Sequence, residues 1–166
     1  MRIFKFALLS ASLIIVLVIL LSLLLPSRVV VSRAIDLSAG KAKIWEGLHD
    51  MQQWPAWNRM TQSAGKQSWH IATDSLMGDQ MTIVLLPNQG DTLPMQWIPL
   101  KGKAMKAGFV VHQSADSSSS VLQWYFDFQL GWYPWEKFTS IILDKQLGPL
   151  MEQSLESFKQ ELAGRP

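Results

Sequence analysis

Hydrophobic and polar residues follow three successive patterns along the chain, and the first is an unbroken apolar run. Residues 6–25 carry no charge over 20 positions. At about 1.5 Å per helical residue the run spans roughly 30 Å, the thickness of the hydrocarbon core of a bilayer. It is longer than the apolar region of a cleaved signal peptide, and no small-x-small cleavage site follows it. The pattern predicts an uncleaved signal-anchor transmembrane helix within residues 1–27.

The second pattern is an alternation of apolar and polar residues, which predicts β-strands. Residues 28–37 alternate with Arg33 interrupting the apolar face, and further strands are predicted at 69–74, 80–86, 93–97 and 105–111. Pro94 argues for an edge or a bend in its strand. The clearest alternation covers residues 122–130, where every second residue is apolar. One buried face and one wet face are typical of an antiparallel sheet that is covered on one side.

The third pattern is helical, and it dominates the C-terminal end. Apolar residues recur there at steps of three and four, and they are Leu147, Met151, Leu155, Phe158 and Leu162. Pro149 suits a first helical turn, so we expect the main helix to restart there after a short helix over residues 134–143. Earlier in the chain, Ser38 is expected to cap a helix over residues 40–51, and Pro55 to hold Trp54 in an extended or turn conformation.

The order of these elements predicts an α+β domain over residues 28–166, preceded by the one N-terminal transmembrane helix. A curved antiparallel sheet wrapped around the long amphipathic C-terminal helix would bury both apolar faces. Where the two faces part, a cavity lined by aromatic and Met side chains is expected. Eight Trp and eight Met residues fit either a broad core or such an adaptable apolar pocket.

The balance of charge and the residues available for catalysis or metal binding limit the functions that the chain could have. Beyond the apolar run, 13 Lys and Arg residues face 13 Asp and Glu residues, so there is no electrostatic case for nucleic acid. The chain has no Cys, its three His residues lack metal-ligand spacing, and no phosphate loop or dinucleotide fingerprint occurs. We therefore expect no metal and no cofactor. Asp127 falls on the polar side of its strand, which predicts a solvated carboxylate without a raised pKa.

Two connections leave alternatives open. Lys101, Lys103 and Lys106 form either a solvated basic loop or a contact for anionic lipid headgroups. The aromatic residues in 132–135 either cap the core or lie at a membrane interface, where Trp and Tyr are favoured.

Several of these positions resemble a known family. An anchor, a strand with Arg before an aliphatic residue, a helix with an aromatic residue and a W-x-x-W motif are typical of membrane-anchored polyketide cyclase/dehydrase-like proteins. These belong to the START-like, helix-grip (SRPBCC) superfamily, with the START/Bet v 1-like fold. The matching residues are Arg33, Ile35, Trp45, Asp50, Trp54, Trp57, Trp124, Leu155, Phe158 and Lys159. Ser154 stands where the family has a Gly. The resemblance implies a deep apolar cavity between the sheet and the C-terminal helix, and it implies no particular activity.

The leading hypothesis is a non-enzymatic, membrane-tethered domain that binds a hydrophobic small molecule or lipid in this cavity. The expected contact residues are Trp97, Phe109, Trp124, Phe126, Met151 and Phe158. One alternative is a cyclase or dehydratase that uses His112, His70 or Glu136 in the same cavity. Another is a protein-interaction module of the cell envelope with a filled core.

The charges around the apolar run predict how the chain is placed in the membrane. Arg2 and Lys5 favour a cytoplasmic N-terminus, although Arg28 and Arg33 oppose them on the other side of the run. We expect a bacterial protein with a single pass through the inner membrane and a periplasmic, or otherwise extracytoplasmic, soluble domain.

Overall fold

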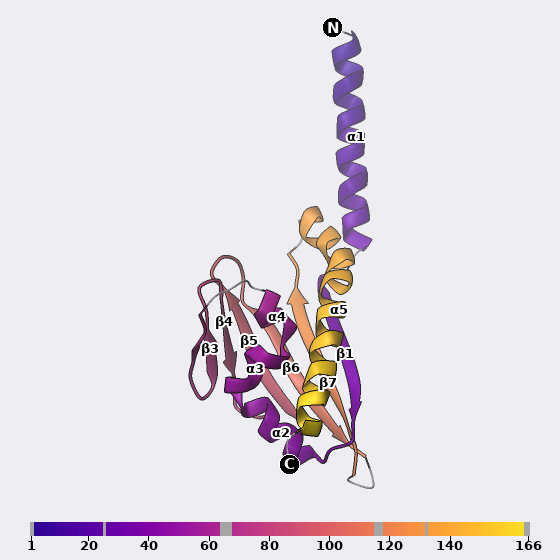
Figure 1. The fold of residues 1–166 in the computed structure, drawn as a ribbon. Helices are drawn as coiled ribbons and strands as arrows, with labels where there is room; N and C mark the ends of the chain where they lie inside the picture. The colour runs from indigo at the N-terminus through magenta and orange to yellow at the C-terminus, as the bar shows by residue number, and fades with distance from the viewer. Residues whose placement is uncertain (1, 25, 64–67, 115–117, 132, 165–166) are drawn as a thin grey trace.

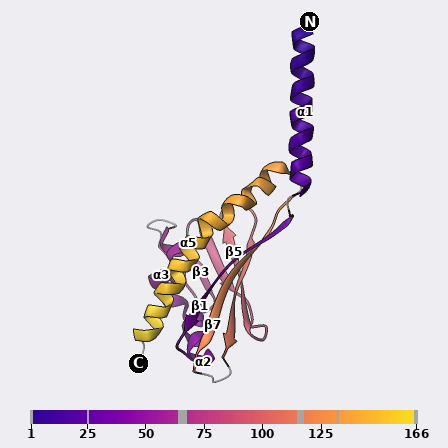
Figure 2. The ribbon, with the colours of Figure 1, turned by 90° about the vertical axis from the view of Figure 1, so that its right-hand side faces the viewer.

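The computed structural model describes residues 2–24, 26–63, 68–114, 118–131 and 133–164. An isolated N-terminal helix leads into a domain in which helices lie on one side of a curved sheet (Figures 1 and 2). The helices are α1 (Arg2–Leu24), α2 (Lys41–His49), the 3-10 helix η1 (Met51–Gln53), α3 (Trp54–Trp57), α4 (Arg59–Ser63) and α5 (Pro134–Gly164). The strands are β1 (Arg28–Leu37), β2 (His70–Ile71), β3 (Ser75–Met77), β4 (Met81–Leu85), β5 (Thr92–Pro99), β6 (Met105–Gln113) and β7 (Ser120–Gln129).

All seven strands form one antiparallel sheet in the order β1-β7-β6-β5-β4-β3-β2. The first and last strands of the sequence pair over their whole length, from Arg28 opposite Gln129 to Leu37 opposite Ser120. This pairing places the start of the domain beside its C-terminal helix, and α5 packs against β1. The predicted α+β fold, a curved antiparallel sheet holding a long C-terminal helix, is confirmed.

The strand faces follow the alternation in the sequence. Leu122, Trp124 and Phe126 are each 0% exposed, whereas Gln123 and Tyr125 between them are only partly covered. β1 has the predicted bounds, and β6 and β7 match their predicted strands closely. The prediction for residues 69–74 is right only for the short β2, and the alternation did not predict β3 at all.

Pro94 lies in an inner strand, so the expectation of an edge or a bend is wrong. β5 pairs with β4 on one side and with β6 on the other. The last β4–β5 pair joins Leu85 to Met95, and the carbonyl of Pro94 accepts from the N–H of Leu86 just beyond it. The missing N–H of Pro94 therefore falls at the end of the β4 ladder, where only the last pairing bond is lost.

The connection from β1 to β2 contains more helix than expected. α2 begins after Gly40 with no side-chain cap, so Ser38 does not cap it. Trp54 has helical backbone angles (φ −55°, ψ −42°), and residues 54–57 form a helical turn with Pro55 in its first turn. Pro disfavours this conformation for the residue before it. The burial of Trp54 and Trp57, at 0% and 1% exposure, offsets that cost.

α5 is one helix that contains Pro149, so the predicted restart at this residue is wrong. The expected apolar stripe is nevertheless correct. Met151, Leu155, Phe158 and Leu162 are buried, and Leu147 is partly buried against the core.

α1 extends away from the sheet (Figure 1). Its residues Phe4–Leu24 are long and apolar enough to cross a membrane by length and composition, and only 6% of that window is buried within the molecule. The helix is therefore no part of the domain's core.

Candidate functional site

The six residues predicted to contact a ligand lie together in the core between the sheet and α5. Each of them is 0% or 1% exposed, and they belong to one hydrophobic cluster: Trp97, Phe109, Trp124, Phe126, Met151 and Phe158. The ring of Trp124 is central, because its centroid lies 5.2 Å from that of Phe109, 5.5 Å from Phe126 and 6.1 Å from Trp97. The structure thus brings the whole predicted set together, as closely packed side chains.

Two further indoles complete this aromatic cluster, and the ligand prediction did not include them. Trp57 packs its ring 4.9 Å from that of Phe158 and meets Trp124 edge-on at 6.5 Å. Trp54 packs 5.2 Å from Trp57 and 6.0 Å from Phe109. The W-x-x-W spacing was the available signal, because residues three apart share one side of a helical turn. The prediction of an extended or turn conformation for Trp54 left this spacing unused.

The four indole N–H groups of the cluster have different surroundings. Trp54 donates to the carbonyl of Leu48 at 2.9 Å, and Trp97 donates to the sulfur of Met95 at 3.1 Å. Among the residues that the structure describes, the Nε1 atoms of Trp57 and Trp124 have no acceptor. A buried donor without a partner costs about 1–3 kcal/mol, so two of them in one cluster need an explanation.

Asn58 adds a third buried donor next to Trp57. Its Oδ1 accepts from the N–H of Met60 at 3.0 Å, which fixes the orientation of the side-chain amide. Within the described part of the chain its Nδ2 has no acceptor, and the residue is 0% exposed. Every unpaired polar atom of residues 57, 58 and 124 is therefore a donor, so a complementary molecule would offer acceptor oxygens.

Arg33 and Ser154 attach α5 to the rest of the domain. The guanidinium of Arg33 bonds Glu152 at 2.6 Å and Asp144 at 2.9 Å, both on α5. These two partners raise the pKa of Arg33 above its ordinary value. The hydroxyl of Ser154 accepts from the N–H of Arg59 at 2.9 Å and donates to the carbonyl of Leu150 at 2.6 Å. Ser154 thus joins α4 to α5.

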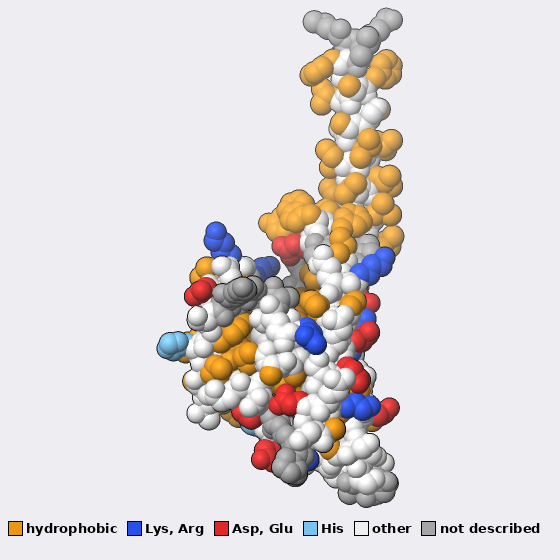
Figure 3. All heavy atoms as spheres, viewed as in Figure 1, with side chains coloured by type: hydrophobic (Ala, Val, Ile, Leu, Met, Phe, Trp, Pro, Cys, Tyr) orange, Lys and Arg blue, Asp and Glu red, His pale blue; other side chains and the backbone are white. Residues whose placement is uncertain are grey.

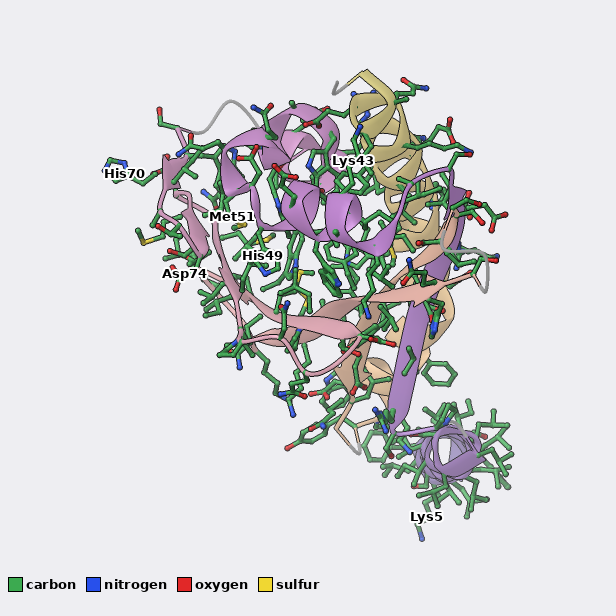
Figure 4. The ribbon with its side chains drawn as sticks, turned by 90° about the horizontal axis from the view of Figure 1, so that it is seen from below. Lys5, Lys43, His49, Met51, His70 and Asp74 are labelled. Carbon is green, nitrogen blue, oxygen red and sulfur yellow. The ribbon has the colours of Figure 1, made fainter. Side chains whose placement is uncertain are left out.

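The residues considered for catalysis lie away from the aromatic cluster. His112 is exposed on β6, on the opposite face from Phe109 and Val111. His70 points outward at the rim of the domain (Figure 4). Glu136, in the first turn of α5, accepts from the N–H of Gly131 and lies 3.8 Å from the Nζ of Lys103. Within the described ranges, no three His, Cys, Asp or Glu side chains are grouped to hold a metal ion.

Asp127 is an ion-pair partner on the outer face of the sheet. Arg28 donates to its two carboxylate oxygens at 2.9 and 2.8 Å, which holds the pKa of Asp127 below its ordinary value. The expectation that the pKa is not raised is confirmed. The expectation of a solvated group is wrong, because the side chain is only 12% exposed under Arg28.

Surface hollows occur at both ends of the domain. One of about 520 Å³ lies at the end far from α1, between the β1–α2 connection and the last turns of α5, and Lys43 and Lys159 are among its lining residues. Another of about 250 Å³ lies on the outer face, between the start of β6 and the end of β7. A third, of about 380 Å³, lies between α1 and the start of α5. None of these three is lined by the aromatic cluster.

Comparison with known proteins identifies the fold. No family model matches the sequence, and no curated protein matches it. Among solved structures, a START superfamily protein from Mycobacterium smegmatis is similar over 81% of this chain and 97% of its own, with a TM-score of 0.56 and 13% identity. The Zhui aromatase/cyclase from Streptomyces sp. R1128 is similar over 82% of this chain and 94% of its own, with a TM-score of 0.59 and 13% identity.

The di-domain aromatase/cyclase StfQ of the steffimycin biosynthetic pathway is similar over 83% of this chain and 52% of its own, with a TM-score of 0.59 and 12% identity. At these identities the likeness concerns the fold, because a shared fold does not carry a shared activity. The chain therefore adopts the START-like, helix-grip fold seen in these START and aromatase/cyclase proteins, preceded by an apolar N-terminal helix.

Proposed function

We propose that the domain binds a hydrophobic small molecule or lipid that carries hydrogen-bond acceptors, between the sheet and α5, and that α1 anchors it in a membrane. The observation that carries this proposal is the pair of buried indole N–H groups of Trp57 and Trp124. An acceptor oxygen of a bound molecule would satisfy these donors, and the surrounding aromatic rings would bury its apolar part. The START-like neighbours are consistent with an apolar ligand in this region.

Binding requires a second arrangement of the core, because the aromatic cluster fills the space in this structure. α3 and α4 are short helices that contact α5 over the cluster. A ligand that binds better to a form with α3 and α4 displaced would shift the population toward that form. The proposal therefore includes movement of residues 54–63 away from α5 when the ligand enters.

The anchoring part rests on the length and apolar composition of α1. Lys5 near its beginning favours a cytoplasmic N-terminus, which would place the domain on the extracytoplasmic side of the inner membrane. The chain enters β1 within a few residues of the end of α1, so the domain would stand directly at the membrane surface.

Native mass spectrometry of the full-length protein, released from mild detergent, tests the ligand. The wild-type protein should carry an additional small-molecule mass. Trp124→Phe, which removes the unpaired N–H, should weaken ligand binding at least about ten-fold, the equivalent of about 1.4 kcal/mol, and so lower the occupied fraction. Trp54→Phe is the comparison variant, because its N–H already bonds Leu48 within the protein, so its loss should not lower occupancy.

A second function is favoured by the tight packing of the aromatic cluster, which needs no ligand to fill it. In that case the domain is an interaction module of the cell envelope that uses its outer surface. A folded wild-type protein without an additional mass, or equal occupancy in both Trp variants, would refute the ligand proposal and favour this alternative.

A further inference from the structure

The beginning of α5 exposes large apolar side chains next to α1. Tyr133 and Trp135 stack with centroids 4.8 Å apart and planes 15° apart, and Trp135 is 66% exposed. Phe138 and Ile142 are 39% and 50% exposed on the following turns. Figure 3 shows hydrophobic side chains along α1 and gathered beside its base. This end of α5 therefore lies beyond the core that buries the rest of the helix.

A groove of about 380 Å³ separates this segment from α1. Its wall on the α1 side is aliphatic and its other wall is mainly aromatic, and its lining residues are Ile14, Ile15, Val18, Ile19, Tyr133, Pro134 and Trp135. The α1 residues of the groove lie inside the apolar window Phe4–Leu24. The groove is therefore continuous with the surface that the proposed anchor presents to lipid.

Helix geometry gives the depth of the groove. Along α1, Ile19 and Ile15 lie about 8 and 14 Å from Leu24, at 1.5 Å per residue. Half the hydrocarbon core of a bilayer is about 15 Å thick. If Leu24 lies at the edge of the core, the aromatic pair Tyr133 and Trp135 contacts α1 within the hydrocarbon of that leaflet.

Basic residues occur at the same end of the domain. Lys101 and Lys103 are exposed in the connection between β5 and β6. β6 begins beside the end of β7, and that end pairs with the start of β1, where the chain leaves α1. Lys103 also lies 3.8 Å from Glu136 in the first turn of α5. Both lysines thus lie at the end of the domain that faces the membrane, where basic residues are attracted to an anionic lipid surface.

We propose that residues 133–142 form a second membrane-inserted element, and that the groove between them and α1 holds an acyl chain of an anionic phospholipid whose headgroup contacts Lys101 and Lys103. This proposal rests on the membrane anchoring stated under the proposed function. In this arrangement α5 connects the bilayer at one end to the aromatic cluster at the other.

Single-cysteine variants of the full-length protein test the insertion, because the natural chain has no Cys. The protein is reconstituted in vesicles of phosphatidylethanolamine and phosphatidylglycerol and treated with a water-soluble maleimide, which reacts with thiolates exposed to water. Trp135→Cys reports the inserted segment. Val16→Cys reports the apolar span, where the residue is 52% exposed in the molecule, and Glu156→Cys reports the exposed far half of α5.

We expect Trp135→Cys and Val16→Cys to react at least about ten-fold more slowly than Glu156→Cys, because hydrocarbon excludes both water and the thiolate. Rapid reaction of Trp135→Cys with a protected Val16→Cys would overturn the insertion and leave the anchoring intact. Rapid reaction at both positions would overturn the anchoring itself. A disulfide between two copies of Trp135→Cys would show a second copy in the groove and overturn the acyl-chain assignment.

Brominated phosphatidylglycerol tests the acyl chain, since bromine quenches nearby indoles. Quenching of the wild-type protein should exceed that of Trp135→Phe, and brominated phosphatidylcholine should quench less. Replacing both Lys101 and Lys103 by Glu should abolish the difference between the two lipids. Equal quenching of the wild-type protein and Trp135→Phe would overturn the lipid site.

Discussion

The four buried indoles of the aromatic cluster provide an internal comparison of hydrogen-bonded and unpaired N–H groups. All four side chains are 0% or 1% exposed: Trp54, Trp57, Trp97 and Trp124. They differ in whether the indole N–H has a hydrogen-bond acceptor. A Trp→Phe substitution removes the same atoms at each site. The cavity that it leaves should cost on the order of 1 kcal/mol each time.

The variants then differ in stability because each indole N–H that is removed has a different hydrogen-bonding state. Trp54→Phe also loses a bond worth about 1 kcal/mol, the one to the carbonyl of Leu48 at 2.9 Å. Trp57→Phe and Trp124→Phe remove a donor that has no acceptor among the described residues, which recovers about 1–3 kcal/mol of desolvation cost. In ligand-free protein we therefore expect Trp54→Phe to be less stable than Trp124→Phe by about 2–4 kcal/mol, with Trp97→Phe between them.

Urea unfolding of the full-length protein in detergent, followed by circular dichroism, measures these differences without relying on Trp emission. Equal slopes with denaturant would show that the variants unfold the same structure. Equal losses of stability in all four variants would refute the reasoning. That result would mean that each N–H has a favourable partner, such as the face of a neighbouring ring, and it would remove the basis of the ligand proposal.

Two further predictions concern charged groups. A Cβ on Gly148 would clash with the Nη2 of Arg33, so Gly148→Ala should be neutral or destabilising in the wild-type protein. In an Arg33→Ala background the same change should stabilise the helix by about 1 kcal/mol, and additivity in a double-mutant cycle would contradict this account. For Asp127, the pKa is lowered in the folded protein by its bonds from Arg28, so the pair stabilises the fold above the unfolded pKa of about 3.9. This stability is lost as the pH falls through the lower folded pKa. Asp127→Asn should therefore make the free energy of unfolding depend less on pH below about pH 4, as measured by acid titrations of unfolding. An unchanged pH dependence in this range would argue against the pair.

The local pattern of apolar and polar residues was sufficient to predict an element wherever one of its faces is buried and the other is not. Alternation predicted β1 with its observed bounds and placed Trp124 and Phe126 on the inner face of β7, because a strand repeats every two residues. Helical spacing likewise predicted the buried stripe of α5. The same patterns brought all six proposed contact residues into one cluster, since each lay on an apolar face that had to be covered.

The three prolines show what the pattern could not decide. Pro94 is tolerated within the sheet because β4 ends beside it, and Trp54 is helical before Pro55 because the indoles of Trp54 and Trp57 are buried. Pro149 lies within one continuous α5. In each case contacts with partners distant in the sequence outweigh the local preference of Pro.

The chemistry of the site depended on tertiary structure in the same way. The sequence alone determined an apolar N-terminal run, a one-sided sheet, an amphipathic C-terminal helix and the absence of Cys. Only the fold decided which indole N–H groups have acceptors, that Arg33 bonds Asp144 and Glu152, and that the aromatic start of α5 lies beside α1. Hydrogen bonds and close packing depend on positions to within a few tenths of an ångström, and such positions are set by contacts between distant segments rather than by residue type.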